Sequence, residues 1–333
     1  MNTTTASVRG ETGAEEDPSG CALCGNARLE RCSADLPRLG SRTPSRFHIA
    51  RCSACGGLQT RPLPSRQEVA ESYGAAYTWH GDEGLTARLE AAYRRTLVRF
   101  DQLRTVRRAA HLAGGVRLID VGCADGLLIS LARRHGLLAF GIDRADAPLW
   151  PECRPEWRIG GDIETIEQPA GSWDVVSLLH VAEHLRAPRR MFAAVHRWLR
   201  PGGTFVVQTP NAACFEARWL GGAWFGWDVP RHVVHFTPQT LMRALDEAGF
   251  EVIAVRHLSW RDNGPSLVAS LFPGLDPLVE REVSLRSGAT RAPLATLIRR
   301  LAYVALTWAV TPVSLLETAL RRSPTVTVLA RKR

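Results

Sequence analysis

An apolar strand followed by a glycine-rich turn constrains the fold of this chain more than any other feature. Residues 116–121 are apolar enough to predict a buried strand, and residues 127–135 have a helical pattern. The turn between them reads Gly122-Cys123-Ala124-Asp125-Gly126. Small residues let a ligand approach the backbone, and the next helix begins with exposed N–H groups. We therefore expect a ligand site at the carboxyl end of this strand.

The same alternation of strand and helix continues along the chain. Further strands are predicted at 138–143, 156–159, 173–179, 204–209, 250–257 and 324–330, and helices at 188–199 and 237–249. Thr237 followed by Pro238 is a standard start signal for the second of these helices. The pattern predicts an α/β fold, a doubly wound Rossmann-like sheet of seven strands.

Composition divides the chain into five parts. We expect a disordered tail over 1–19, a small cysteine-containing module over 20–66 and a helical linker over 67–113. The α/β domain covers 114–261 and 323–333, and a helical insertion occupies 262–322, before the last strand.

Two C-x-x-C pairs predict a metal site in the cysteine-containing module. Cys21 and Cys24 form the first pair, Cys52 and Cys55 form the second, and a glycine follows each pair. Two such turns supply four thiolates in a tetrahedron, the usual geometry of structural zinc. The first twenty residues do not resemble a signal peptide, so we expect a reducing compartment, where such cysteines hold metal rather than form disulfides. Because all four ligands come from the protein, the zinc would be structural.

Acidic residues follow the predicted strands at spacings that suit an adenosine-containing cofactor. Asp120 lies at the end of the first strand and Asp143 ends the second, where a carboxylate can accept both hydroxyls of a ribose. Asp162 and Ile163 follow the third strand, where they can contact an adenine. Acidic residues after successive strands indicate such a cofactor more specifically than a glycine-rich turn alone does.

These motifs resemble class I S-adenosylmethionine-dependent methyltransferases, and most of all the ubiquinone-biosynthesis O-methyltransferase group. The resemblance covers roughly 114–260 and the last strand. It rests on the turn 120–126, Gly-Ile-Asp143, the segment Trp173–Leu185, Pro201-Gly-Gly, Thr209-Pro-Asn and the stretch from His232 to Pro238. Ala124 departs from the glycine that the family most often has. Residues 51–64, together with Tyr73 and Tyr77, are similar to a zinc ribbon that precedes some of these enzymes.

The resemblance implies a role for each matching residue. It places Gly122, Ala124 and Gly126 beside the methionine part of S-adenosylmethionine. It places Asp143 on the ribose, and Asp162 and Ile163 on the adenine. His180, at the end of the fourth strand, would lie near the reactive sulfonium.

Histidines are the candidates for a general base. An oxygen nucleophile of high pKa needs a base for methyl transfer, and histidine is the commonest one. His180, His184, His232 and His235 are candidates; we favour His232 as the base, with His180 as a further catalytic residue. The alternative is that these histidines and the nearby tryptophans Trp219, Trp224 and Trp227 build a substrate lid. The fourth strand lacks the Asn/Asp-Pro-Pro-aromatic motif of many N-methyltransferases, so methylation of DNA adenine or of glutamine is not expected.

Positive charge is concentrated in the last part of the chain. The net charge is +9, and residues 281–333 hold ten basic and two acidic side chains. An apolar stripe (Leu294, Leu297, Ile298, Leu301, Ala305, Trp308, Ala309) faces a polar one that contains Arg299, Arg300 and Tyr303. A basic amphipathic helix predicts contact with a membrane surface through 293–322. A soluble lid, a homodimer face and a true membrane span are the alternatives.

The sequence thus predicts an enzyme that methylates an oxygen or carbon of a small-molecule or lipid-linked acceptor in a biosynthetic or cell-envelope pathway. We expect it in the cytoplasm, with possible peripheral contact at the inner face of the membrane. The alternatives are a zinc-containing RNA methyltransferase and a non-catalytic zinc-ribbon interaction protein. Nucleic acid is the less favoured partner, because the basic charge lies in the apolar C-terminal segment and not in the cysteine module.

Overall fold

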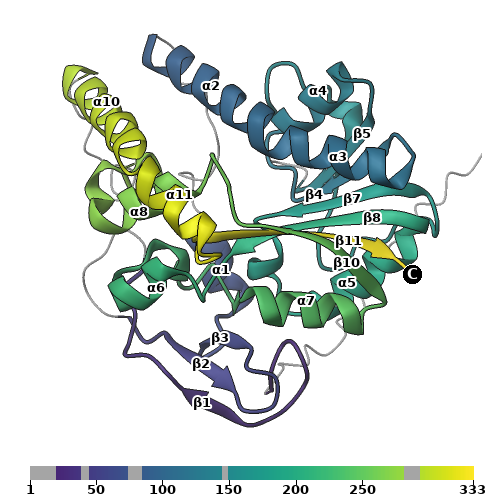
Figure 1. The fold of residues 1–333 in the computed structure, drawn as a ribbon, viewed down its shortest axis with the longest axis horizontal. Coiled ribbons are helices and arrows are strands. Elements are labelled where there is room, and N and C mark those ends of the chain that lie inside the picture. The colour runs from purple at the N-terminus through teal and green to yellow at the C-terminus, as the bar shows by residue number, and fades with distance from the viewer. Residues whose placement is uncertain (1–19, 39–44, 74–84, 145–148, 281–292) are drawn as a thin grey trace, which may run out of the picture.

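A seven-stranded sheet forms the centre of the molecule in the computed structural model, which describes residues 20–38, 45–73, 85–144, 149–280 and 293–333 (Figure 1). The strand order is β10 (Phe250–Arg256), β11 (Thr325–Lys332), β8 (Leu199–Pro210), β7 (Trp173–Leu179), β4 (Arg117–Val121), β5 (Leu138–Asp143) and β6 (Arg158–Gly160). β11 runs antiparallel to both of its neighbours, and the other six strands run parallel to one another. The predicted doubly wound α/β sheet and the strand at its C-terminal end are confirmed.

Helices cover both faces of this sheet. One face carries α2 (Leu85–Val98), α3 (Arg104–Ala113) and α4 (Leu127–Arg134), and the other carries α5 (Pro188–Trp198) and α7 (Pro238–Glu247) (Figure 1). A π-helical turn, η2 (Arg99–Leu103), joins α2 to α3. Thr237 begins α7 with a capping box, as its sequence predicts. Because the strands are buried on both faces, the carboxyl edge of the sheet is left for binding.

The third strand of the parallel run begins later than the sequence predicts. The expected strand over 156–159 is instead a 3-10 turn, Pro155–Trp157, followed by the short β6. Pro155 fixes its own φ and has no N–H for a sheet ladder, so a turn forms first. The predicted tail 1–19, Tyr77 within the helical linker, and 281–292 within the insertion lie outside the described residues.

A second, four-stranded sheet contains the cysteine module and one strand of the α/β domain. Its order is β1 (Leu29–Arg31), β2 (His48–Cys52), β3 (Leu58–Arg61) and β9 (Val234–His235). β9 comes from the segment after β8, and it pairs with β3 in the register Leu58 to His235. The short helix α1 (Arg66–Tyr73) follows β3. The module is therefore joined to the α/β domain by main-chain hydrogen bonds.

Helices occupy the chain between β10 and β11, as predicted for an insertion. They are α8 (Asn263–Leu271), α10 (Pro293–Ala309) and α11 (Thr311–Ala319). α8 packs against α10 and α11, and α10 projects outward from them (Figure 1). A further short helix, α6 (Phe215–Leu220), lies next to the end of α11, where the Phe215 N–H donates to the Arg322 carbonyl (2.8 Å).

Candidate functional site

The turn after β4 has the backbone that its small residues predict. Gly122, Ala124 and Gly126 all have positive φ, at 75°, 49° and 79°. A Cβ at Gly122 would lie 2.3 Å from Cγ2 of Val181, so only glycine fits there. Val181 follows β7, the neighbour of β4. The turn and the segment after β7 are therefore in direct contact at the carboxyl edge of the sheet.

Two carboxylates face this turn. The Ala124 N–H donates to Asp143 Oδ2 (2.6 Å), and the Arg144 N–H donates to Asp143 Oδ1 (2.8 Å). Asp120 is buried and accepts from the Ser177 hydroxyl (2.6 Å). Burial raises the pKa of Asp120 to about 7, although the Ser177 hydrogen bond lowers it. The narrow turn and the acid at the end of β5 fit an adenosine-containing cofactor.

Asp162 and Ile163 follow β6, at the same edge of the sheet. The Gly161 N–H donates to the Asp143 carbonyl (3.0 Å), which ties this loop to β5. Asp162 is exposed, lies 3.6 Å from Arg66 and accepts from the Glu164 N–H (2.9 Å). Ile163 is half-buried against the core. Both side chains thus lie on the β5 side of the turn, and Asp162 already has a cationic neighbour.

His180 ends β7 between two carboxylates. Its Nε2 lies 3.1 Å from Asp262 Oδ2 and its Nδ1 lies 3.3 Å from Glu183 Oε1. Its φ of 58° turns the side chain out of the strand. Burial alone would lower the pKa of His180, but the carboxylates of Asp262 and Glu183 outweigh it and raise this pKa to about 9. His180 is therefore an imidazolium at neutral pH, a donor rather than a base.

A chain of hydrogen bonds holds Asp262 in place. The Ser259 hydroxyl lies within hydrogen-bond distance of both Asp262 Oδ2 and Asp101 Oδ2. A hydroxyl has one proton, so Ser259 can donate to only one of these two acids at a time. Burial, above all, and the neighbouring Asp262 raise the pKa of Asp101. Asp101 lies in the π-helical η2, a feature that is frequent at functional sites.

Glu183, His184 and His232 form a second buried group next to His180. Their ligand atoms all lie within 4.8 Å of one another. His184 Nδ1 lies 3.0 Å from the Arg231 carbonyl, and His232 Nδ1 lies 2.8 Å from the Gly226 carbonyl. A carbonyl only accepts, so each ring donates from Nδ1, and the Nε2 of His232 lies 3.8 Å from Asp228 Oδ2. Burial lowers the pKa of His184 to about 4, so this ring is neutral at pH 7. The group can accept a proton or hold a divalent cation.

His235 packs edge-on against the His232 ring, with ring centroids 6.4 Å apart, and forms part of the contact with β3. Its Nε2 lies 2.9 Å from the Thr60 hydroxyl, and its ring packs edge-on against Trp227, with ring centroids 5.1 Å apart. Burial holds the pKa of His235 well below its usual value. The Thr60 hydroxyl also donates to the His232 carbonyl (2.6 Å). The cysteine module therefore contacts the backbone of the residue that the sequence favours as base.

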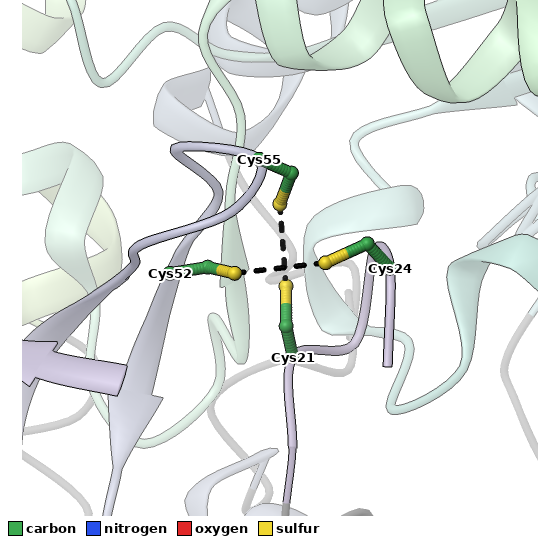
Figure 2. A group of neighbouring side chains, drawn as sticks. All are labelled: Cys21, Cys24, Cys52 and Cys55. Atoms are coloured by element: carbon green, nitrogen blue, oxygen red, sulfur yellow. Dashed lines mark hydrogen bonds between the residues drawn. The ribbon is translucent and has the colours of Figure 1, made fainter. Parts of the chain in front are cut away.

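The four paired cysteines converge on one point (Figure 2). Cys21 Sγ lies 3.5 Å from Cys55 Sγ, and Cys24 Sγ lies 3.6 Å from Cys52 Sγ. These distances are too long for disulfides. They approach the sulfur separation of about 3.8 Å that a tetrahedron with zinc–sulfur bonds of about 2.3 Å requires. The Leu23 and Gly57 N–H groups donate to sulfur. The cluster fits a closed, four-thiolate metal site.

Comparison with known proteins settles the family. The family model described as a methyltransferase domain matches residues 87–255, just over half of the chain. The chain belongs to the methyltransferase domain family. Ubiquinone biosynthesis O-methyltransferases from Maricaulis maris and Nitrosococcus oceani are 30% and 31% identical to it over 155 and 161 residues. These matches cover 42% and 46% of this chain and 61% and 65% of the relatives, less than two thirds of their length.

A solved S-adenosylmethionine-dependent methyltransferase from Archaeoglobus fulgidus is similar to this chain at a TM-score of 0.44 and 17% identity. The similarity covers 75% of this chain and the whole of that one. Nothing about the activity of this chain follows from a likeness at that level.

Sequence reasoning missed three residues that lie around His180. Asp262, Ser259 and Asp101 support His180, and none of them lies in a recognisable motif. One signal was present. β10 is parallel to the central strands, so the loop that follows it must reach the same carboxyl edge as the loops after β4 and β7. A polar loop at that position is a candidate contributor to the site.

Proposed function

We propose that this chain transfers a methyl group from S-adenosylmethionine to an oxygen or carbon of a small-molecule or lipid-linked acceptor. The observation that carries this proposal is the contact between the turn after β4 and the histidine-rich segment after β7. It puts the backbone of that turn against Val181, two residues before Glu183, whose carboxylate groups with His184 and His232. The named activity of the ubiquinone-biosynthesis relatives agrees with an oxygen acceptor.

The residues have distinct roles in this proposal. S-adenosylmethionine, when bound, supplies a methyl carbon already activated by a sulfonium. Asp143 accepts the ribose hydroxyls, and Gly122, Ala124 and Gly126 leave room for the methionine part. Asp120 supports the turn from the end of β4, and Asp162 and Ile163 flank the adenine. The protein then has to position the acceptor and remove its proton.

His232 is the proposed base. Its Nδ1–H is held by the Gly226 carbonyl, so its Nε2 can accept the proton of the acceptor. The carboxylates of Glu183 and Asp228 stabilise the imidazolium that forms. His180 is the less suitable base, because the carboxylates of Asp262 and Glu183 keep it protonated. We propose that His180, with both ring nitrogens held by Asp262 and Glu183, positions the end of β7 and the Glu183 carboxylate.

We propose that the four cysteines hold one structural zinc ion. They leave no open position for a substrate, so the zinc would stabilise the module and, through β3 and β9, the segment that contains His232. In this mechanism the zinc ion does not contact the acceptor.

Cofactor binding and turnover test the proposal separately. Isothermal titration with S-adenosylmethionine should show binding that weakens about 10- to 100-fold in Asp143→Ala, because a charge-assisted hydrogen bond is lost. Asp246→Ala, which removes an exposed acid from α7, is the matched control and should bind as the parent does. No binding by the parent protein would overturn the proposal and favour a non-catalytic zinc-ribbon protein.

The base assignment has its own test. His232→Ala should lower kcat by about 10²–10⁴-fold, the usual contribution of a general base, with unchanged S-adenosylmethionine binding. His111→Ala, an exposed histidine of α3, is the control. Normal turnover by His232→Ala would remove His232 from the mechanism. Loss of turnover on chelation, with the cysteine-bound zinc retained, would instead assign Glu183, His184 and His232 to a metal.

A further inference from the structure

The helices α10 and α11 present an outward face that is entirely apolar. Thirteen residues between 294 and 320 are exposed, and none of them is polar. We call this set the apolar face: Leu294, Ala295, Ile298, Leu301, Ala305, Trp308, Ala309, Pro312, Val313, Leu315, Leu316, Ala319 and Leu320. The largest of its side chains, Trp308, is 60% exposed. Monomeric proteins rarely expose so continuous an apolar surface.

Polar groups of the same helices point inward. The four buried residues of this stretch are Tyr303, Thr307, Ser314 and Glu317, and each carries a polar group. The Tyr303 hydroxyl lies 3.4 Å from Asp276, and Arg299 on the same helix lies 3.4 Å from Glu280. The usual arrangement of an amphipathic helix in water is therefore inverted. An inverted helix pair needs an apolar environment on its outward side.

The contacts of α10 and α11 with the rest of the protein argue against a helix that crosses a membrane. A helix of suitable length and mean hydropathy for a membrane span covers Leu294–Ala319, with 22% of its window buried. However, α10 and α11 pack against α8, and the Asn263 side chain of α8 approaches the Thr318 hydroxyl (3.4 Å). After α11 the chain enters β11 in the central sheet. A span would break these contacts.

Charge distinguishes a lipid surface from a second copy of the chain. Arg321 and Arg322 are exposed directly after Leu320 of the apolar face, and the one acidic residue between 294 and 322, Glu317, is buried. Two copies that met face to face would bring these positive charges together, at an electrostatic cost. An anionic bilayer attracts the same charges while the apolar side chains enter the headgroup region.

Exposed aromatic side chains continue the apolar face onto α6. Phe215 and Trp219 are exposed and their rings stack with centroids 6.2 Å apart. Phe215 is held next to the end of α11 by its hydrogen bond to Arg322. Aromatic residues of this kind favour the membrane–water interface. We infer that the apolar face of α10 and α11 docks the protein on the surface of an anionic lipid bilayer.

Flotation of the full chain with vesicles tests this inference without any enzymatic readout. The parent protein should float with vesicles that contain phosphatidylglycerol, and less with pure phosphatidylcholine; added salt should weaken the difference. Leu301→Glu/Leu316→Glu should lower the bound fraction about tenfold or more, because two charges must enter the interface. Arg321→Gln/Arg322→Gln should weaken binding to the anionic vesicles alone.

The control places the same two charges on other exposed apolar positions. Phe100→Glu/Leu112→Glu, on η2 and α3, should bind vesicles as the parent does. Equal loss in this control, or no binding of the parent to anionic vesicles, would overturn the inference. A dimer in sedimentation velocity that Leu301→Glu/Leu316→Glu dissociates would assign the apolar face to a second copy. Failure of the methyl-transfer proposal would leave the vesicle result unaffected.

Discussion

The cysteine module and the C-terminal insertion are both additions to the same sheet, but they are built in opposite ways. The module buries its apolar side chains, such as Phe47, and joins the domain through main-chain pairing of β3 with β9. The insertion buries Tyr303, Ser314 and Glu317 of α10 and α11 and exposes the leucines of the apolar face. Each nevertheless reaches the site, through Thr60 to His232 in one case and through Asp262 to His180 in the other. The apolar core of the module is therefore buried within the protein, whereas the apolar outer surface of the insertion is exposed.

Removal of the proposed zinc should have the largest effect. Cys52→Ser should reduce zinc from about one ion per chain to a small fraction and unfold the module, because binding of structural zinc is coupled to folding. Turnover should fall about 10²-fold, since the segment with His232 loses its pairing with β3. Elemental analysis and a methyl-transfer assay check both outcomes. Cys32→Ser, an exposed cysteine of the same module, should change neither. Full activity after zinc loss would separate the module from catalysis.

Truncation of a core side chain in the cysteine module should have the second-largest effect. Phe47 is fully buried and packs with Leu36, Ile49 and Val229, the last of which belongs to the α/β domain. Phe47→Ala should lower the free energy of unfolding by about 3–5 kcal/mol through the lost contacts and the cavity. Thermal or urea unfolding measures this loss. Phe100→Ala, at an exposed position, should cost far less. Similar losses in both variants would contradict the packed contact between module and domain.

The contact of the insertion with His180 should appear in the pH dependence of stability. The folded protein raises the pKa of His180 to about 9 from a usual 6.5, so its pairing stabilises the fold fully below pH 6.5. This contribution of about 1–3 kcal/mol is lost as the pH rises through 9. In Asp262→Asn the loss of stability between pH 7 and 10 should be smaller. Asp35→Asn, an exposed acid, should keep the parent slope. An equal dependence of stability on pH in Asp262→Asn and in the parent would contradict the pairing of Asp262 with His180.

Truncation on the outer surface of the insertion should have the smallest effect. Leu316 is 60% exposed, so Leu316→Ser should change the free energy of unfolding by no more than about 0.5 kcal/mol in dilute solution. This contrasts with Phe47→Ala at the other addition. Urea unfolding of both variants gives the comparison directly. A large loss for Leu316→Ser would show that the apolar face is already covered in solution.

Local patterns in the sequence predict the sheet, the cofactor turn and the cysteine cluster, because each depends on residues close together in the chain. The partners of His180 and His232 could not be predicted in this way. Ser259 and Asp101 are 158 positions apart, and Thr60 and His232 are 172 positions apart. The periodicity of 294–309 shows two faces, but it cannot say which one is buried. Which face is buried depends on α8, whose Asn263 side chain approaches the Thr318 hydroxyl of α11.

The most direct test of this account is methyl transfer from radiolabelled S-adenosylmethionine to a fractionated extract of the host cell. The parent protein should place label in the organic or small-molecule fraction, and Asp143→Ala and His232→Ala should each abolish most of it. Label that ribonuclease releases would contradict the account and favour an RNA methyltransferase. No transfer to any fraction, by a protein that binds the cofactor, would contradict the catalytic role of the group around His232.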